Sequence, residues 1–427
     1  MAKLLLFSHS GFSDENANGI TMKNLLSAWN AEEMAQFYCD VQPPDYSAAH
    51  NCFRVTDTQM LKAFLGKKAQ HIFAYTSHEA ESSGKPGKKP SGTPKRIPGW
   101  LKKHKYNFWL KWLREYLWMV SPWGHGKLNK WIGEMAPDVI VYMVGESLSL
   151  DNLVLKACRQ TGKPLVLYHG EAFRIIDVMK RRGLERAYYR ATAARYRKIS
   201  AAASLAIYNC PMLQSDYEAM YPGSPRGIVA YNSAKCDYAP YTPGEMVNIT
   251  YFGNLGVGRS PMLLETADIL REIDSSLVLD IYGNAPEEYA RQFREHGNIR
   301  YHGFVDAARL RRIVEESDIL LHVESFEPEI MPKLRYAFST KIAQCLCAGR
   351  CFVSFAPADT ASSRYLASAE GAMLVSSREE LARTLDKLIH DPALRARIAE
   401  ITRQTGLNNH RMEQTARMVR EEIGAIK

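Results

Sequence analysis

The sequence has no long apolar run. None of its runs approaches the roughly 20 residues that a helix needs to cross a bilayer, and the mean hydropathy is −0.29. The first apolar stretch, residues 4–7, is also too short for the core of a signal peptide. The sequence therefore predicts a cytoplasmic protein with no membrane-spanning helix, and leaves open peripheral attachment to the inner face of the membrane.

Cysteine is sparse and is not arranged in pairs. The eight cysteines form no CxxC motif, and several lie in apolar runs, among them Cys158, Cys345, Cys347 and Cys351. Scattered apolar cysteines are typical of buried free thiols in a reducing compartment. We expect neither disulfides nor a zinc site.

The sequence also has no GxGxxG dinucleotide fingerprint, because Gly11 and Gly19 in the first polar loop lie eight residues apart. What it has is a repeated alternation of strand and helix patterns over 427 residues, with 46% hydrophobic and 24% charged residues. This pattern predicts an α/β protein with two Rossmann-like, doubly wound domains. The Pro- and Gly-bearing stretch 236–246 is the expected linker.

A helix start after a buried strand is the clearest candidate site. The apolar strand 319–323 is followed by Ser339, Thr340 and Lys341, and then by a helical run that stops at Gly349. Free N–H groups, the helix dipole and the lysine charge together suit a phosphate. The alternative is an ordinary capped helix with a solvated lysine.

Four segments carry a resemblance to a known family. They are residues 251–259 (YFGNLGVGR), 298–305 (NIRYHGFV), 318–326 (DILLHVESF), and 335–350 with RYAFSTKI and LCAGR. In order and spacing this region, about 245–405, resembles the donor half of GT-B glycosyltransferases of the retaining family 4. The resemblance implies the GT-B fold, with two domains facing across a cleft, and transfer from a UDP- or GDP-linked sugar with retention of anomeric configuration and without a metal or other cofactor. The absence of an Asp-x-Asp motif agrees with the last point.

The resemblance assigns roles residue by residue. The glycine loop and the helix start would hold the donor diphosphate, residues 298–305 would bind the base, and a carboxylate after the strand 319–323 would face the reaction, with Glu324 favoured over Glu327 and Glu329. The expected donor residues are Gly253, Asn254, Gly256, Arg259, Ser339, Thr340, Lys341 and Gln344, and the expected base-binding residues are Tyr301, Gly303 and Phe304.

The sequence departs from the family at three positions. Tyr336 and Gln344 stand where two glutamates eight apart are usual, and Asn254 stands where the glycine loop usually has an arginine. Gln344 can still hydrogen-bond ribose hydroxyls, though without a charge. These changes leave phosphate binding in place and put the catalytic assignment in doubt.

The N-terminal half offers looser candidates. His169 and Glu171 follow the strand 164–168, at the edge where an open α/β sheet presents ligand groups. The resemblance places a histidine here against the transferred sugar, and it places the loop with Gly11 and Gly19 at the cleft. A structural histidine and a plain surface loop are the alternatives.

The domain boundaries follow from these segments. We expect an acceptor-side domain over 1–240, which includes a basic and aromatic excursion over 82–131. A nucleotide-sugar domain over 241–406 comes next, and the final helix 407–427 crosses back to the first domain.

The net charge of +9 is unevenly placed. Residues 85–130 contain twelve Lys or Arg and one acid. Six of the seven tryptophans lie in residues 85–131, namely Trp100, Trp109, Trp112, Trp118, Trp123 and Trp131. A helix over about 100–120 with separate aromatic and basic faces predicts peripheral attachment to an anionic membrane surface. The alternative is that the aromatic stripe packs on its own domain. Nucleic acid is not expected, because no nucleic-acid fold accompanies the charge.

The function predicted is a hexosyltransferase-type, metal-independent glycosyltransferase. It would act on a glycan or lipid-linked acceptor in the synthesis of surface polysaccharide or glycoconjugate. Two alternatives remain: a GT-B-like binding or scaffold subunit without turnover, and a nucleotide-sugar epimerase.

Overall fold

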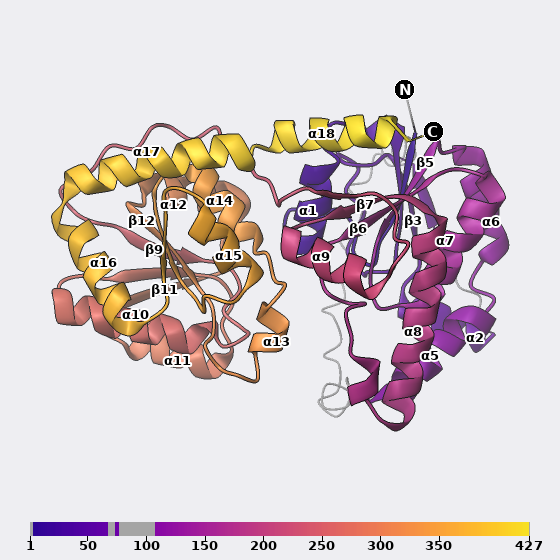
Figure 1. Cartoon of the computed structure of the whole chain (residues 1–427), viewed down its shortest axis with the longest axis horizontal. Coiled ribbons are helices and arrows are strands. Elements are labelled where there is room, and N and C mark those ends of the chain that lie inside the picture. Colours follow the sequence, from indigo (N-terminus) through magenta and orange to yellow (C-terminus); the bar gives the residue numbers. More distant parts are fainter. Residues whose placement is uncertain (1–2, 67–72, 77–106, 427) are drawn as a thin grey trace. The chain divides into compact units, whose positions relative to one another are not determined.

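The computed structural model describes residues 3–66, 73–76 and 107–426. The chain forms two compact units, each built on its own sheet (Figure 1). Unit 1 comprises Met1–Asn209, Leu213–Ala230 and Met418–Lys427, and unit 2 comprises Cys210–Met212 and Tyr231–Arg417. The α/β class and the two Rossmann-like sheets expected from the sequence are confirmed.

Unit 1 has an eight-stranded sheet in the order β4-β3-β2-β1-β5-β6-β7-β8. All neighbouring strands are parallel except β3 and β4, which pair antiparallel. Parallel strands buried on both faces read as continuous apolar runs, which is why β1, β5 and β6 were visible in the sequence. The strands are β1 Leu4–Phe7, β2 Met34–Tyr38, β3 Asn51–Arg54, β4 Phe73–Thr76, β5 Val139–Met143, β6 Leu165–His169, β7 Ala203–Tyr208 and β8 Gly227–Val229.

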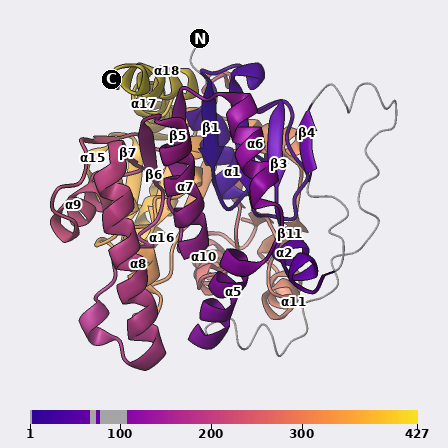
Figure 2. The same ribbon diagram turned by 90° about the vertical axis from the view of Figure 1, so that its right-hand side faces the viewer.

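The helices of unit 1 form two layers. In Figure 2 α5, α6, α7 and α8 lie in front of the sheet, and α1 and α18 pack on the other face, where Val419 and Ile423 share a core with Leu4 and Met22. The helices are α1 Ala17–Leu25, α2 Asp57–Phe64, α5 Phe108–Val120, α6 His125–Met135, α7 Leu148–Thr161, α8 Gly183–Ala202 and α9 Pro211–Met220, with the 3-10 turns η1 Ala31–Glu33 and η2 Val178–Lys180.

Unit 2 has a six-stranded, fully parallel sheet in the order β11-β10-β9-β12-β13-β14. Numbered from its own first strand this is 3-2-1-4-5-6, the doubly wound order that reverses between its first and fourth strands. Here the reversal lies between β9 and β12. The strands are β9 Ile249–Phe252, β10 Leu279–Tyr282, β11 Ile299–Gly303, β12 Ile319–Val323, β13 Cys351–Phe355 and β14 Ala372–Val375.

Helices cover both faces of this sheet. Figure 1 shows α10 and α11 on one side and α14 and α17 on the other. The core is aliphatic, with Leu263 and Leu270 of α10 packed against strand residues such as Ile281 and Leu321. The helices are α10 Arg259–Ile273, α11 Glu287–Glu295, α12 Ala307–Glu316, α13 Met331–Leu334, α14 Thr340–Ala348, α15 Ala361–Ser368, α16 Arg378–His390 and α17 Pro392–Asn409. The last helix, α18 Met412–Gly424, begins in unit 2 and ends in unit 1.

The segment expected to link two domains packs on unit 2 instead. Arg350 donates to the carbonyl of Ala239, and Tyr241 donates to the carboxylate of Asp318. The chain passes from unit 1 to unit 2 at Ala230–Tyr231, and back within α18. The final helix is also shorter than 407–427, because α17 ends at Asn409 and α18 begins at Met412.

One cysteine expectation is wrong. Cys236 and Cys347 are joined by a disulfide, although 111 residues separate them in sequence. Ala234 forms a parallel β-bridge with Arg411, which directly follows α17. Cys236, two residues on, contacts the carbonyl of Gly406 in α17 and thereby reaches Cys347 of α14. The spacing of the two cysteines in the sequence does not indicate that residues 234–236 lie next to the end of α17. The described cysteines outside this pair are free thiols, as expected.

Candidate donor site

The candidate site lies at the point where the strand order of unit 2 reverses. Open α/β sheets bind ligands at the carboxyl ends of the strands on either side of such a reversal. Those strands are β9 and β12, which pair in parallel, so the loops that follow Phe252 and Val323 meet at one edge. The glycine loop follows β9, and Glu324 follows β12 directly.

The glycine loop lies under the lysine side chain of α14. Gly253 has a φ of +122°, and a Cβ placed on it would be 2.8 Å from Lys341 Cδ. A residue with a side chain would therefore be strained in its backbone and would also displace the lysine. Asn254 is exposed and folds back on the loop, where its Oδ1 accepts from the N–H of Gly256 at 2.8 Å.

Arg259 and Glu324 form an ion pair across the two loops. Arg259 opens α10, and its Nη2 lies 2.8 Å from Glu324 Oε1, with both side chains largely buried. Burial of a paired charge is tolerated when hydrogen bonds satisfy the remaining polar atoms. Within the part of the chain that the structure describes, however, Arg259 Nε and Glu324 Oε2 are buried and have no hydrogen-bond partner. Each member of the pair thus keeps one polar atom available for a ligand.

Lys341 stands at the start of α14. Ser339 caps this helix, with its hydroxyl accepting from the N–H of Lys341 at 3.3 Å. Lys341 Nζ donates to the hydroxyl of Tyr251 at 2.8 Å and lies 4.4 Å from that ring's centroid. Burial, together with the charge of nearby Arg259, lowers the pKa of Lys341 to about 7, while Glu324 acts in the opposite direction. The ammonium is therefore close to losing its proton until an anion arrives.

Two residues of this cluster were missed in the sequence. Tyr251 on β9 accepts from Lys341 and donates to the carbonyl of Asn254 at 2.7 Å, so it links the lysine to the glycine loop. His322 on β12 is fully buried, and its Nε2 lies 3.5 Å from Glu324 Oε1. Burial, Lys341 and Arg259 hold the pKa of His322 well below its usual range, so the ring is neutral. A histidine inside the apolar run 319–323 was the available signal for it.

Backbone hydrogen bonds of Tyr282 and Gly283 connect the glycine loop to the expected base-binding loop. The N–H of Gly253 donates to Tyr282, and the N–H of Gly283 donates to Gly303, each at 2.8 Å. The hydroxyl of Tyr301 donates to the carbonyl of Gly283 and accepts from Ala285, so it fastens the loop instead of facing a base.

An aromatic surface next to this loop was not predicted. The rings of Tyr282 and His302 stack at 4.4 Å between centroids, and His302 Nε2 lies 2.6 Å from Asp280 Oδ1. Phe304, one of the expected base-binding residues, is exposed at the end of β11. These rings give the loop flat surfaces on which a base can stack.

The remaining donor residues lie on the first turns of α14. Thr340 and Gln344 are half-buried and four residues apart, so they share one face of the helix. Arg335 lies over the ring of Tyr336, which occupies one of the family's glutamate positions. The helix start therefore presents an amide and hydroxyls beside Lys341.

His169 does not have the environment expected of a sugar-facing residue. The ring is fully buried, stacks on Tyr208 with centroids 4.6 Å apart, and shares a 2.7 Å hydrogen bond with the hydroxyl of Tyr196. Burial lowers its pKa to about 3, so it is neutral. This placement favours the structural alternative. Glu171, two residues on, is exposed.

Gly11 and Gly19 are brought together by the first loop. A Cβ on Gly19 would be 2.8 Å from the carbonyl oxygen of Gly11, and Asn16 caps α1 by accepting from the N–H of Gly19 at 2.6 Å. Both glycines are buried. They allow the loop after β1 to close on α1, and their place at a cleft stays a prediction.

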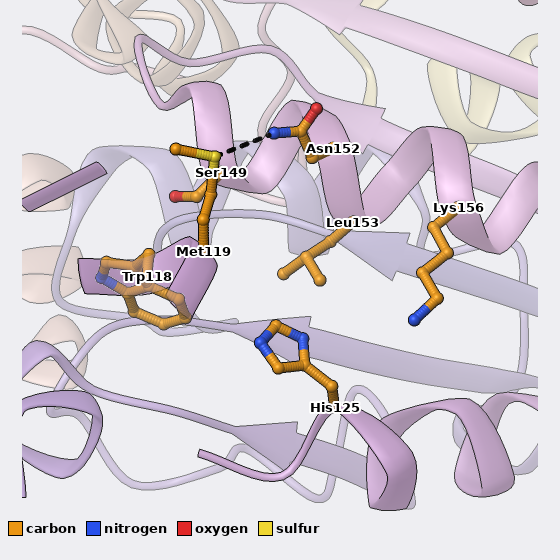
Figure 3. Close-up of a pocket in the computed structure, with 7 residues that line it drawn as sticks. All are labelled: Trp118, Met119, His125, Ser149, Asn152, Leu153 and Lys156. Carbon is orange, nitrogen blue, oxygen red and sulfur yellow. Dashed lines mark hydrogen bonds between the residues drawn. The ribbon is translucent and has the colours of Figure 1, made fainter. Parts of the chain in front are cut away.

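A separate hollow of about 310 Å³ lies in unit 1 between α5, α6 and α7 (Figure 3). Trp118 and Met119 line it from α5 and His125 from the start of α6. The side chains of Asn152, Leu153 and Lys156 border it from α7, with Asn152 Nδ2 3.7 Å from Met119 Sδ. It contains none of the donor-binding, base-binding or catalytic residues predicted from the sequence.

The tryptophans of the basic segment divide between core and surface. Trp118, Trp123 and Trp131 are buried, whereas Trp109 is 63% exposed and Trp112 half-buried. The observed helix α5 begins at Phe108, and Trp100 lies outside the described residues. The alternative, in which the aromatic residues pack on their own domain, therefore holds for Trp118, Trp123 and Trp131. Trp109 does not pack in this way, and membrane attachment stays a prediction for it.

Within the described ranges, no helix is both long and apolar enough to span a membrane. In the same ranges, no three His, Cys, Asp or Glu side chains are grouped so that they could hold a metal ion.

Comparisons with known proteins agree with the fold. The structure of HepE from Anabaena in complex with UDP matches with a TM-score of 0.64 at 12% identity, covering 99% of this chain and 100% of that one. The sucrose-phosphate synthase of Thermosynechococcus elongatus matches with a TM-score of 0.60 at 11% identity, with both chains fully covered. WaaG, a glycosyltransferase involved in lipopolysaccharide biosynthesis, matches with a TM-score of 0.54 at 14% identity over 97% of this chain and 99% of its own.

At these identities the structural matches establish the two-domain GT-B fold. The sequence model of the family described as "Glycosyl transferase-like" matches residues 259–421, which begin at Arg259 and include Glu324 and Lys341. No curated protein matches the sequence significantly. Residues 259–421 are thus similar to this glycosyltransferase family, in agreement with the sequence motifs, and the whole chain has the GT-B fold.

Proposed function

We propose that this protein transfers a sugar from a nucleoside-diphosphate sugar, UDP-linked in the first instance, to a glycan or lipid-linked acceptor. The observation that carries the proposal is the cluster of Arg259, Glu324 and Lys341 at the sheet reversal of unit 2. HepE has been solved with UDP and with UDP-glucose, which supports UDP over GDP as the first donor to test.

The cluster suits the charge that develops during transfer. When the bond from the anomeric carbon to the diphosphate breaks, negative charge grows on the leaving oxygen, and donors aimed at it lower the barrier. Arg259 can donate to a phosphate through Nε, which has no protein partner among the described residues, while Nη2 keeps its bond to Glu324. Lys341 and the N–H groups at the start of α14 complete the cradle.

Glu324 and Gln344 would contact the sugar and the ribose. Glu324 Oε2 is buried and has no partner within the described part of the chain, so it can accept a hydrogen bond from a sugar hydroxyl. Gln344, half-buried on the first turns of α14, can bond ribose hydroxyls as a neutral group. We propose that the reaction retains anomeric configuration, as in family 4.

The acceptor side is the less defined half of the proposal. WaaG acts in lipopolysaccharide biosynthesis, and its fold likeness supports a surface glycan or glycoconjugate as the product class. Glu171, exposed at the end of β6, is the unit 1 residue that we place nearest to this step.

The test is slow hydrolysis of donor sugars without acceptor. Purified protein is incubated with UDP-glucose, UDP-galactose and the matching GDP-sugars, and released nucleoside diphosphate is measured. Release from one donor, lost in Lys341→Ala, supports a transferase. A non-catalytic binding subunit would bind the donor without release, and an epimerase would change the sugar while leaving the diphosphate bond intact.

A further inference from the structure

Most of the exposed large apolar side chains of unit 1 lie on three neighbouring elements. These are α2, α5 and the stretch from η2 to the start of α8, and α5 packs against both α2 and α8. Figures 1 and 2 show the three at the same end of unit 1. We name this the α5 surface, and its apolar members are Leu61, Phe64, Leu65, Trp109, Leu110, Leu113, Tyr116, Met119, Val120, Met179 and Leu184.

The exposed stripe is the outer face of a helix whose inner face is firmly held. Trp109, Leu113, Tyr116 and Val120 follow one another at spacings of four, three and four, which is one side of α5. On the other side Trp118 is 2% exposed, and its Nε1 donates to Asp57 at 2.7 Å. Because the helix is already anchored, the outer stripe is not needed for its attachment to unit 1.

A contact between α5 and α7 places the α5 surface near the carboxyl edge of the unit 1 sheet. Glu115 on its inner side accepts from the N–H of Ser149 at 2.7 Å and from the hydroxyl of Ser147, and so caps α7. Since α7 follows β5, this contact places α5 at the carboxyl edge of the unit 1 sheet. That is the edge where open α/β sheets present their ligands.

The charge around the α5 surface is basic. On these elements the described cations outnumber the acids: Lys62, Lys111, Arg114, Lys180, Arg181 and Arg182 against Asp57 and Glu115. Lys111 and Arg181 are paired with Glu146 and Glu185. In sequence, residues 85–105 add eight Lys or Arg and no acid, and this stretch leads directly into α5. Two copies of the chain meeting through this face would bring its described cations together, so a homodimer is disfavoured.

We propose that the α5 surface docks on a bilayer that contains anionic phospholipid. Tryptophan and tyrosine favour the headgroup boundary, aliphatic side chains enter the acyl region, and nearby Lys and Arg are attracted to acidic headgroups. Docking here would bring the acceptor edge of unit 1 to the membrane, where a lipid-linked acceptor resides. The proposal stands on this surface, independently of the transfer reaction, and its test uses no sugar donor.

The experiment is vesicle co-sedimentation of the full chain. The vesicles are phosphatidylcholine alone or mixed with phosphatidylglycerol, at about 0.1 M and about 0.5 M NaCl, because salt screens headgroup attraction. The variants are Trp109→Ser combined with Tyr116→Ser and, as a matched control, Met246→Ser, which alters an exposed apolar residue of unit 2. Thermal melting checks that each variant is folded.

The proposal predicts binding to the acidic vesicles that weakens at the higher salt. The double variant should lose at least about tenfold in apparent affinity, since membrane partitioning scales with the apolar area buried, while Met246→Ser binds like the wild type. Wild-type protein that stays in solution in all conditions would overturn it, as would a folded double variant that sediments normally. A dimer in sedimentation velocity that the same double variant disperses would show a second copy as the occupant, and would also overturn it.

Discussion

At the scale of single residues, the donor site holds two buried cations close together, Lys341 and Arg259, each at a helix start. Arg259 helps burial to lower the pKa of Lys341, whereas Glu324 helps to keep the pKa of Arg259 raised. Both were visible in the sequence, because a lysine after Ser-Thr at a helix start and an arginine at the end of a glycine loop have local signatures. Tyr251 and His322 were missed, since the one available signal, a histidine inside the apolar run 319–323, does not say what the side chain contacts.

Lys341→Ala should weaken donor binding and slow the release of nucleoside diphosphate. Removing one charged donor at a developing charge costs roughly 2–4 kcal/mol, or about 30-fold to 1000-fold in rate. The measurement is kcat/KM for donor hydrolysis. Lys333→Ala, which removes an exposed lysine on the preceding short helix, is the matched control. Equal kcat/KM in wild type and Lys341→Ala would show that the cradle is misplaced.

The affinity for UDP should fall as the pH rises above neutrality. The pKa of Lys341 is about 7 in the free protein, so the ammonium loses its proton as the pH rises through that value. A bound diphosphate favours the charged form, and binding at pH 8 should therefore take up a proton. Calorimetry in buffers of different ionisation enthalpy measures this uptake. Proton uptake that persists in Lys341→Ala would assign it to another group.

His169→Ala is expected to cost stability more than turnover. The ring fills a fully buried site among tyrosines, and its loss leaves a cavity and an unpaired Tyr196 hydroxyl. The expected loss is roughly 2–4 kcal/mol in the free energy of unfolding of unit 1. Denaturant unfolding is compared with turnover per folded molecule. A variant that melts normally but turns over slowly would restore the catalytic role expected from the sequence.

At the scale of elements, the aromatic segment illustrates what a sequence pattern leaves undecided. The helical spacing of its tryptophans predicted an amphipathic helix, and α5 exists with the stripe exposed from Trp109 to Val120. The pattern could not show that Trp118 and Trp123 turn inward, because the partners that bury them come from β2 and α2. Those contacts are long-range and leave no local trace.

The contact between α5 and α7 gives a prediction at this scale. Glu115→Ala would leave the buried N–H of Ser149 without its acceptor and should destabilise unit 1 by about 1–3 kcal/mol. Glu115→Gln keeps an acceptor of the same size and is the matched control. Thermal unfolding distinguishes them, and an alanine variant that melts with the wild type would contradict the assigned cap.

At the scale of the whole molecule, two sheets could be predicted because parallel strands are continuous apolar runs. The boundary between the two units was harder to predict from the sequence. Pro and Gly in residues 236–246 indicate irregular backbone, but this segment packs on unit 2 and does not separate the units. The Cys236–Cys347 disulfide and the interruption between α17 and α18 at residues 410–411 both lie where the segment around Ala234 pairs with Arg411. This pairing joins residues far apart in the chain, so no local pattern in the sequence predicts it.

The central claim is that unit 2 binds a nucleoside diphosphate at the Arg259–Glu324–Lys341 cluster. The direct measurement is thermal and denaturant unfolding with UDP and GDP, on wild type and Lys341→Ala. At 100 times Kd, UDP should add about 2.7 kcal/mol of stability to the wild type. At the same concentration it should add far less to Lys341→Ala. No stabilisation by either nucleotide, or equal stabilisation of both proteins, would contradict the account.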